Sequence, residues 1–282
     1  MAGQAITGAE APEQAAAFFA RFSTIVLVGN SEAMDVAALR RQYADDTLFV
    51  FFNKTYKVLS QPFDGISLLV ARSGTMGANI VHRREVPQVL APLREGGFCG
   101  ILNIRVGGGE VFSPAADFGI GAVGHLDLSQ SVAGFYPSTH LPTTGFALAL
   151  FLSEAVPATR IVLAGFTAKR SARWKLFYDH DWTFEQITLR LMRRSGRIEM
   201  TGARDEASPL AAIARRFPDI SPDDVALTAA EVLTERVETA NVAIDRLMGL
   251  TRLQGRVDGW LRSLKPATRK QRHAAKDTAS KG

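Results

Sequence analysis

The chain has 282 residues, of which 46% are hydrophobic and 22% charged, so it can bury a sizeable core and is not disordered over its whole length. Its formal net charge of +5 comes mainly from basic residues near the C-terminus, without which the body is close to neutral. A single cysteine, Cys99, excludes an internal disulfide and a cysteine-rich zinc site, which agrees with a reducing compartment.

The N-terminal residues do not have the pattern of a secretory signal, because they carry acids and no basic patch followed by an apolar stretch. The longest apolar runs, such as 25–28 and 147–152, are much shorter than the roughly 20 residues of a membrane-spanning helix. We therefore expect a cytoplasmic protein.

Short apolar runs alternate with amphipathic stretches from residue 24 to about residue 198. Continuous apolar strands of this kind are typical of a parallel sheet buried on both faces, so we predict an α/β fold with a Rossmann-like parallel sheet covered by helices. Such sheets bind ligands beyond the carboxyl ends of their strands. The predicted strands are 25–28, 47–52, 66–71, 100–104 and 161–164, and the predicted helices are 33–43 and 146–154.

The Gly-rich stretch 105–124 is predicted to be one long loop. Within it, residues 107–109 lack the Gly-Lys-Ser/Thr of a phosphate-binding P-loop and are interpreted as a plain turn.

After residue 207 the composition shifts to Ala, Leu, Arg and Glu, which divides the chain into a body (1–207), a helical extension (208–265) and a tail (266–282). Ser221 is a suitable helix cap and Pro222 fits the first turn. The apolar stripe from Val225 to Leu264 predicts one long helix or a helical hairpin, which must be covered. The body of the same chain and a homo-oligomer through these helices are equally good covers, and a membrane surface ranks third.

The tail is basic and has no aromatic residues among its charges, so we interpret it as a disordered, solubilising end and not as a nucleic-acid site. The rival interpretation is a peripheral contact with the anionic inner membrane, to which each Lys or Arg contributes about 1 kcal/mol.

Chemistry-bearing residues gather at three strand ends. Gly29, Asn30 and Ser31 follow the first strand, where a tight turn and a helix start form an anion site or simply a turn with a serine cap. A full Gly-x-Gly-x-x-Gly is missing, which argues against a nicotinamide or flavin enzyme. The second group, Pro142-Thr143-Thr144-Gly145, precedes an apolar helix and either binds a ribose, phosphate or carboxylate or caps that helix.

The third group, residues 174–185, is the most unusual stretch, with aromatic residues, a lysine, a histidine and acids close together. Histidine takes up a proton near neutral pH, so His180 is the preferred general base, and Glu185 either orients it or caps a helix. Among the other histidines, His82 and His273 are expected at the surface, whereas His125 and His140 are candidates for substrate contact from loops.

Together, in this order, the three groups resemble the sialyl motifs of the eukaryotic-type sialyltransferases over about residues 25–202. Residues 28–31 look like the start of the large motif, with Asn53 and Asp64-Gly65 similar to its later parts. Residues 142–145, followed by an apolar helix and a strand ending in Gly-Phe, resemble the small motif, normally Pro-Ser-Thr-Gly. His180 to Glu185 is similar to the His-x4-Glu very small motif.

The resemblance implies a distant bacterial cytosolic homologue with the single-domain sialyltransferase variant of the GT-A fold, inverting and using no metal or other cofactor. The donor would be a CMP-activated sialic acid or related ulosonic acid such as Kdo, and the acceptor an oligosaccharide or lipid-linked glycan. His180 would be the base. The implied donor-binding residues are Gly29, Asn30, Ser31, Asn53, Thr143, Thr144, Gly145, Trp174 and Lys175, with Lys175 in place of the family's motif-three histidine.

Two other functions are compatible with the same residues. Asp179-His180-Asp181 is formally an Asp-x-Asp sequence, which in other glycosyltransferases holds Mn²⁺ and a nucleoside diphosphate sugar. A non-enzymatic nucleotide or glycan sensor would use the same site without turnover.

Overall fold

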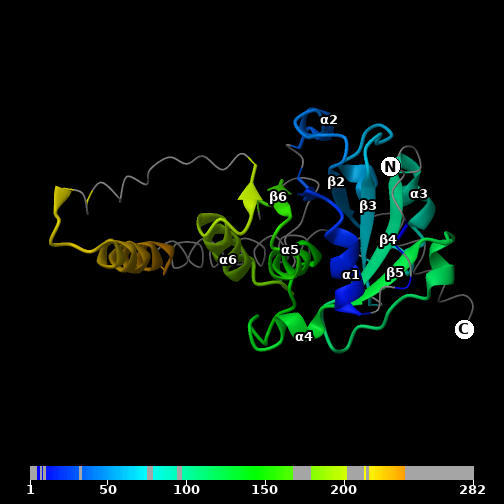
Figure 1. Ribbon diagram of the computed structural model, residues 1–282. Coiled ribbons are helices and arrows are strands. Elements are labelled where there is room, and N and C mark those ends of the chain that lie inside the picture. The colour runs from blue at the N-terminus through cyan, green and yellow to red at the C-terminus, as the bar shows by residue number, and fades with distance from the viewer. Residues whose placement is uncertain are drawn as a thin grey trace, which may run out of the picture. The chain divides into compact units, whose positions relative to one another are not determined.

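The computed structural model describes residues 5, 6, 8, 11–31, 34–74, 79–93, 97–167, 179–201, 213 and 216–238. The chain forms two compact units, Met1–Ala203 and Arg204–Gly282. All of the residues that the sequence analysis assigns to a site belong to the first unit, which is built around a β-sheet (Figure 1).

The first unit contains a seven-stranded sheet in the order β5-β4-β3-β2-β1-β6-β7, and every neighbouring pair is parallel. Its central strands are buried along their whole length, because β2 and β3 have no exposed residue. The predicted α/β, Rossmann-like parallel sheet is therefore confirmed. The strands are β1 Thr24–Val28, β2 Leu48–Phe52, β3 Ser67–Arg72, β4 Phe98–Arg105, β5 Val123–Asp127, β6 Arg160–Ala164 and β7 Glu199–Met200.

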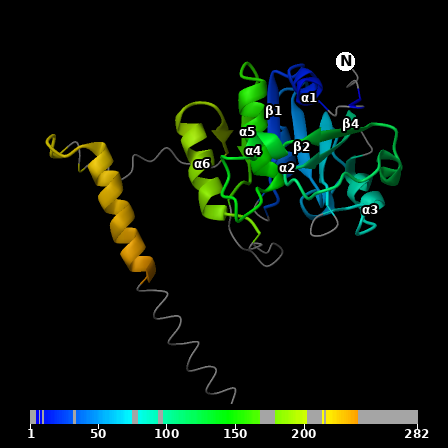
Figure 2. The same ribbon diagram turned by 90° about the horizontal axis from the view of Figure 1, so that it is seen from below.

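Helices cover both faces of this sheet (Figures 1 and 2). One apolar core joins the sheet to α1 Pro12–Phe19, α4 Ser129–Val132, α5 Thr144–Ala155 and α6 Trp182–Arg194. The core on the other face includes α2 Val36–Arg40, α3 Val86–Leu90, η2 Ala91–Leu93 and η3 Ala115–Phe118, and η1 Thr55–Lys57 lies between β2 and β3 in the chain. Alternate residues of β1, β2, β3 and β6 enter these two cores, as the pleat of a sheet requires.

The chain reverses its direction across the sheet next to β1. It runs outward from β1 through β5 and then returns through α5 to β6 on the opposite side of β1. Val28 and Ala164, the last residues of β1 and β6, are paired in register, so the two strands end side by side. Ligands of open parallel sheets bind at such a switch point.

Glycines allow the two turns at this switch point to approach each other closely. Gly29 N donates a hydrogen bond to Ala164 O at 2.7 Å, and a Cβ on Gly29 would lie 3.0 Å from the Gly165 backbone. Gly165 has φ +79°, and a Cβ there would lie 3.1 Å from Gly29 O. A side chain at either position would push the turns apart.

The edges of the sheet differ from the prediction. The stretch 105–124, predicted to be one long loop, contains η3 and the start of β5, and β7, α1 and α6 were not predicted. Because β5 pairs with β4 alone, its residues alternate between buried and partly exposed, and the sequence lacks a continuous apolar run there.

In the second unit, residues 222–238 form a helix. Its predicted start is confirmed, because Ser221 Oγ accepts a hydrogen bond from Asp224 N at 3.0 Å. Apolar side chains of this helix, such as Leu227 and Leu233, are exposed. Apart from residues 213 and 216–221, the rest of the predicted extension and the tail lie outside the described residues. Among the residues that are described, no helix is both long and apolar enough to cross a membrane.

Candidate functional site

The turn after β1 leaves a buried acceptor without a partner. The side-chain oxygen Oδ1 of Asn30 is buried, and no hydrogen bond reaches it from the described residues. Ser31 does not cap a helix, because α2 begins only at Val36 and its cap is Asp35, whose carboxylate accepts from Ala38 N at 2.9 Å. The predicted helix N-terminus at this turn is therefore wrong, and an anion here would meet turn backbone and not a helix dipole.

The turn before α5 does open a helix. Thr143 is its N-cap, because Oγ1 accepts a hydrogen bond from Phe146 N at 3.2 Å. The predicted capping of this helix by the 142–145 group is therefore confirmed. Thr144 is buried in the first turn. A Cβ on Gly145 would lie 2.7 Å from the ring of Phe166, which follows β6, so this glycine lets the turn pack against the switch point. The twelve-residue α5 thus directs its positive end toward the carboxyl edge of the sheet.

A buried carboxylate holds the start of α5. Glu185, 3% exposed, accepts hydrogen bonds from Thr143 N at 2.6 Å, from Thr143 Oγ1 at 2.7 Å and from the Tyr136 hydroxyl at 3.0 Å. Burial raises the pKa of Glu185 to about 7, although the bonds from Thr143 and Tyr136 act in the opposite direction. The first turn of α6 is thereby joined to the first turn of α5.

The imidazole of His180 lies against the same segment. Its Nδ1 is 2.7 Å from the carbonyl oxygen of Leu141, and Leu141 N donates to Asp179 O at 2.8 Å. A carbonyl only accepts, so Nδ1 carries the hydrogen and Nε2 of the neutral ring keeps a free lone pair. Burial lowers the pKa of His180, opposed by the Leu141 bond and reinforced by the charge of Arg72. The ring is therefore neutral near pH 7 and able to accept a proton.

Glu185 has neither of its two predicted roles. The Leu141 carbonyl orients His180, and the cap of α6 is Asp181, whose Oδ1 accepts from Phe184 N at 2.9 Å. Glu185 instead binds the residue that caps α5. It still contributes to the site, because it links the element that follows His180 to the turn on which the ring rests.

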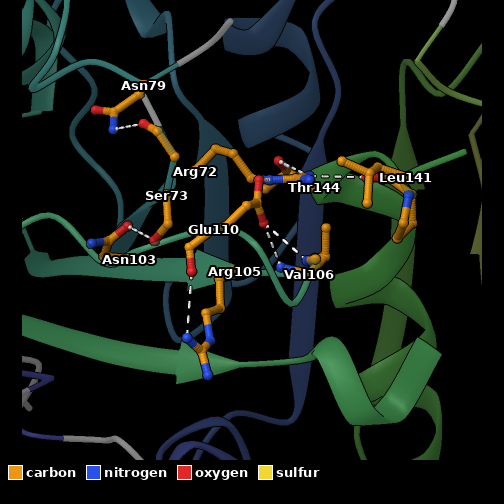
Figure 3. A network of polar contacts seen from close by, with 12 residues as sticks. Arg72, Ser73, Asn79, Asn103, Arg105, Val106, Glu110, Leu141 and Thr144 are labelled. Atoms are coloured by element: carbon orange, nitrogen blue, oxygen red, sulfur yellow. Dashed lines mark hydrogen bonds and ion pairs between the residues drawn. The ribbon is translucent and has the colours of Figure 1, made fainter. Parts of the chain in front are cut away.

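A polar network that was not predicted from the sequence adjoins this turn (Figure 3). Arg72, the last residue of β3 and 8% exposed, donates from Nε to Glu110 Oε1 at 2.6 Å and from Nη1 to Pro142 O at 2.9 Å. Glu110 Oε2 accepts from the backbone N–H groups of Val106 and Gly107 at 2.8 and 3.1 Å. The only sequence signal was an arginine that ends an otherwise apolar strand.

Asn53 belongs to this network and not to an open surface. It has φ 44° and is 7% exposed, and its Oδ1 accepts from Arg72 N at 3.0 Å. Its oxygen therefore shapes the end of β3. Of the predicted donor-binding residues, Thr143, Thr144 and Gly145 follow closely after Leu141, whose carbonyl oxygen contacts His180. Gly29 is linked to Gly145 through Phe166, and Trp174 and Lys175 lie outside the described residues.

Of the other described histidines, His125 and His140 have partners of their own. His125 is in β5 and not in a loop as predicted, with Nε2 3.0 Å from Ser113 O and its ring against Phe112. His140 Nδ1 lies 2.8 Å from Thr139 Oγ1, and His82 is exposed as predicted. His273 is not among the described residues. Searched over the described part of the chain, no group of three or more His, Cys, Asp or Glu side chains is placed to hold a metal ion.

Comparison with known proteins gives one distant structural likeness. No family model and no curated protein matches the chain. Among solved structures, the crystal structure of a mammalian sialyltransferase in complex with Gal-beta-1-3GalNAc-ortho-nitrophenol is similar, with 13% identity and a TM-score of 0.37 over 71% of this chain and 76% of that one. At this level of likeness the activity of that protein is not transferred to the chain.

Proposed function

We propose that the chain is an inverting glycosyltransferase that moves sialic acid or a related ulosonic acid such as Kdo from a CMP-sugar to a glycan, with His180 as general base. The observation that carries the proposal is the hydrogen bond from His180 Nδ1 to the Leu141 carbonyl. It leaves Nε2 as the basic atom of a ring that contacts Leu141, two residues before the cap of α5, and an anionic donor is stabilised at the N-terminus of that helix.

In the proposed transfer the base acts on the acceptor hydroxyl, and the anion site stabilises the phosphate that leaves. Nε2 of His180 takes the proton of an acceptor hydroxyl while that oxygen forms a bond to the anomeric carbon. The bond from this carbon to the phosphate oxygen breaks, and its electron pair leaves with CMP. The products are the inverted glycoside, CMP and a proton held by the imidazole, which passes to solvent. Hydrogen-bond donors directed at the developing negative charge on the phosphate lower the activation barrier of the transfer most.

Donor binding is proposed for the turns around the switch point. The first turn of α5, with Thr143, Thr144 and Gly145, would hold the ribose and the sugar carboxylate, since N–H groups and a helix dipole favour negative charge there. The unpartnered oxygen of Asn30 is an acceptor for a donor hydroxyl or amino group. Gly29 and Ser31 complete the β1 side, and Asn53 contributes only by holding the end of β3 through Arg72 N. Trp174 and Lys175 are assigned from the sequence resemblance alone.

The acceptor is proposed to be an oligosaccharide or a lipid-linked glycan, with the protein in the cytoplasm. Contact of the basic tail with an anionic membrane surface remains the alternative to a solubilising role for that tail. No metal or other cofactor is part of the proposal, because a single phosphate leaving group carries less charge than a diphosphate and can be stabilised by N–H groups and a cationic side chain.

Calorimetry with CMP, CDP, UDP and NAD tests the donor class, and a clear preference for CMP is expected. His180→Ala should keep CMP binding and reduce transfer by roughly 10²–10⁴-fold. His82→Ala, an exposed histidine, is the matched control and should leave both unchanged.

Three results would replace the proposal. A preference for UDP or CDP, with transfer lost to a chelator and restored by Mn²⁺, favours the Asp-x-Asp alternative. A His180→Ala variant with unchanged ligand binding and unchanged biological output indicates a sensor. No binding of any of these nucleotides removes the donor assignment altogether.

A further inference from the structure

A largely buried ion pair contacts the 141–144 turn, to which the imidazole of His180 is hydrogen-bonded. Arg72 Nε and Glu110 Oε1 are 2.6 Å apart, and their side chains are only 9% and 15% exposed. From this position Arg72 Nη1 donates to Pro142 O at 2.9 Å and approaches Thr144 Oγ1 at 3.5 Å. The guanidinium therefore contacts residues immediately after Leu141, whose carbonyl oxygen binds His180.

Further hydrogen bonds hold both partners of the pair in place. Asn53 Oδ1 accepts from Arg72 N at 3.0 Å, while Glu110 Oε2 accepts from Val106 N at 2.8 Å and Gly107 N at 3.1 Å. The ends of β2, β3 and β4 thus determine where the guanidinium lies. Because the N–H groups of the guanidinium lie in one rigid plane, its position in turn determines the position of the 142–144 turn. A lysine cannot hold two partners in this fixed geometry.

The pair also lies within electrostatic range of the imidazole. The charged groups that act on His180 are Arg72, which lowers its pKa, and Asp179 and Glu110, which raise it, while burial is the largest effect and lowers it. Asp181 follows on the same segment and caps α6.

We propose that Arg72, held by Glu110, is a positioning residue for the transfer reaction: it fixes the 141–144 turn so that His180 stays in the Nδ1–H form with Nε2 directed outward. The inference rests on the proposed function, since it concerns the same base. Arg72 itself touches neither the ring nor, in this scheme, the reacting atoms.

The experiment follows the tautomer of His180 by ¹³C and ¹⁵N NMR of histidine-labelled protein above the pH at which the ring titrates. His180→Gln assigns the signal. The test variant is Arg72→Gln/Glu110→Gln, in which both charges are removed so that neither is left buried alone. The control is Arg105→Gln/Asp127→Asn, an ion pair at 2.5 Å between the ends of β4 and β5 whose hydrogen bond to Glu110 goes to the backbone carbonyl.

The wild type and the control should show the Nδ1–H tautomer alone. The test variant should show a mixture with the Nε2–H form, together with a fall in kcat on the order of 10²-fold. Arg72→Lys, which keeps the charge, should give an intermediate mixture, and it serves as the test if the double variant does not fold.

A folded test variant, or a folded Lys variant, that retains the pure Nδ1–H tautomer overturns the inference, and the pair is then only structural. Because the NMR signal is read without any substrate, this failure is distinct from failure of the proposed function, in which the wild type shows the expected tautomer but transfers no sugar from a CMP donor.

Discussion

Replacing Glu185 with glutamine tests how the buried carboxylate contributes to stability. Its pKa is raised from 4.5 to about 7 because it is buried, so the folded protein binds this proton more tightly than the unfolded chain does. The free energy of unfolding should therefore fall as pH rises from 4.5 to 7, by about 1.4 kcal/mol per pH unit, or roughly 3 kcal/mol in all. Below 4.5 and above 7 the effect of this group is constant.

Glutamine cannot titrate, so it removes this dependence while keeping the volume and one oxygen acceptor. We expect the wild type to lose about 3 kcal/mol of unfolding free energy relative to Glu185→Gln between pH 4.5 and pH 8, measured by urea denaturation at intervals across that range. Glu154→Gln, on the exposed side of α5, is the control for general effects of removing a carboxylate. Parallel stability curves for the wild type and Glu185→Gln would refute the reasoning.

Three further outcomes are expected. Since burial lowers the pKa of His180, the acid limb of kcat/KM for transfer should lie below the ordinary value of 6.5 and disappear in His180→Ala; a limb above 6.5 contradicts this assignment. Gly165 has φ +79°, and a Cβ added there would lie 3.1 Å from the backbone oxygen of Gly29, whereas Gly119 has φ +65° and open space around an added Cβ. Gly165→Ala should therefore lower the melting temperature clearly more than Gly119→Ala. Equal losses would show that only backbone strain matters. Ser221→Ala should cost about 1 kcal/mol of helix stability, read as lost ellipticity near 222 nm, and Ser195→Ala is its control.

The central strands were predictable because burial on both faces leaves a continuous apolar run in the sequence. Leu48–Phe52 is the clearest case, since all of its residues are buried. The edge strand Val123–Asp127 has one neighbour and alternates in exposure, so Gly, His and Asp interrupt its pattern. The local sequence thus predicted the central strands of the sheet and not its edge strands.

Each short segment of the candidate site could be predicted from the sequence, but most contacts between distant segments could not. The turn 142–145 and His180 were identified from residue types and spacing, and the structure brings them together through Leu141. Arg72, Glu110 and Pro142 were not associated, because their contact depends on how three strand ends meet. Glu185 was noticed, but its partner Thr143 is 42 positions away and no local pattern indicates it.

One consequence follows from the attachment of the imidazole to the backbone just ahead of α5. The proposed proton acceptor and the proposed carboxylate-recognising loop share a stretch of chain, so the two cannot be altered independently. A substitution in that loop meant to change which sugar is accepted would also tilt the ring and slow the chemistry. Redesign of sugar preference is therefore better directed at the opposite side, around Asn30, where a side-chain oxygen has no bonding partner among the described residues.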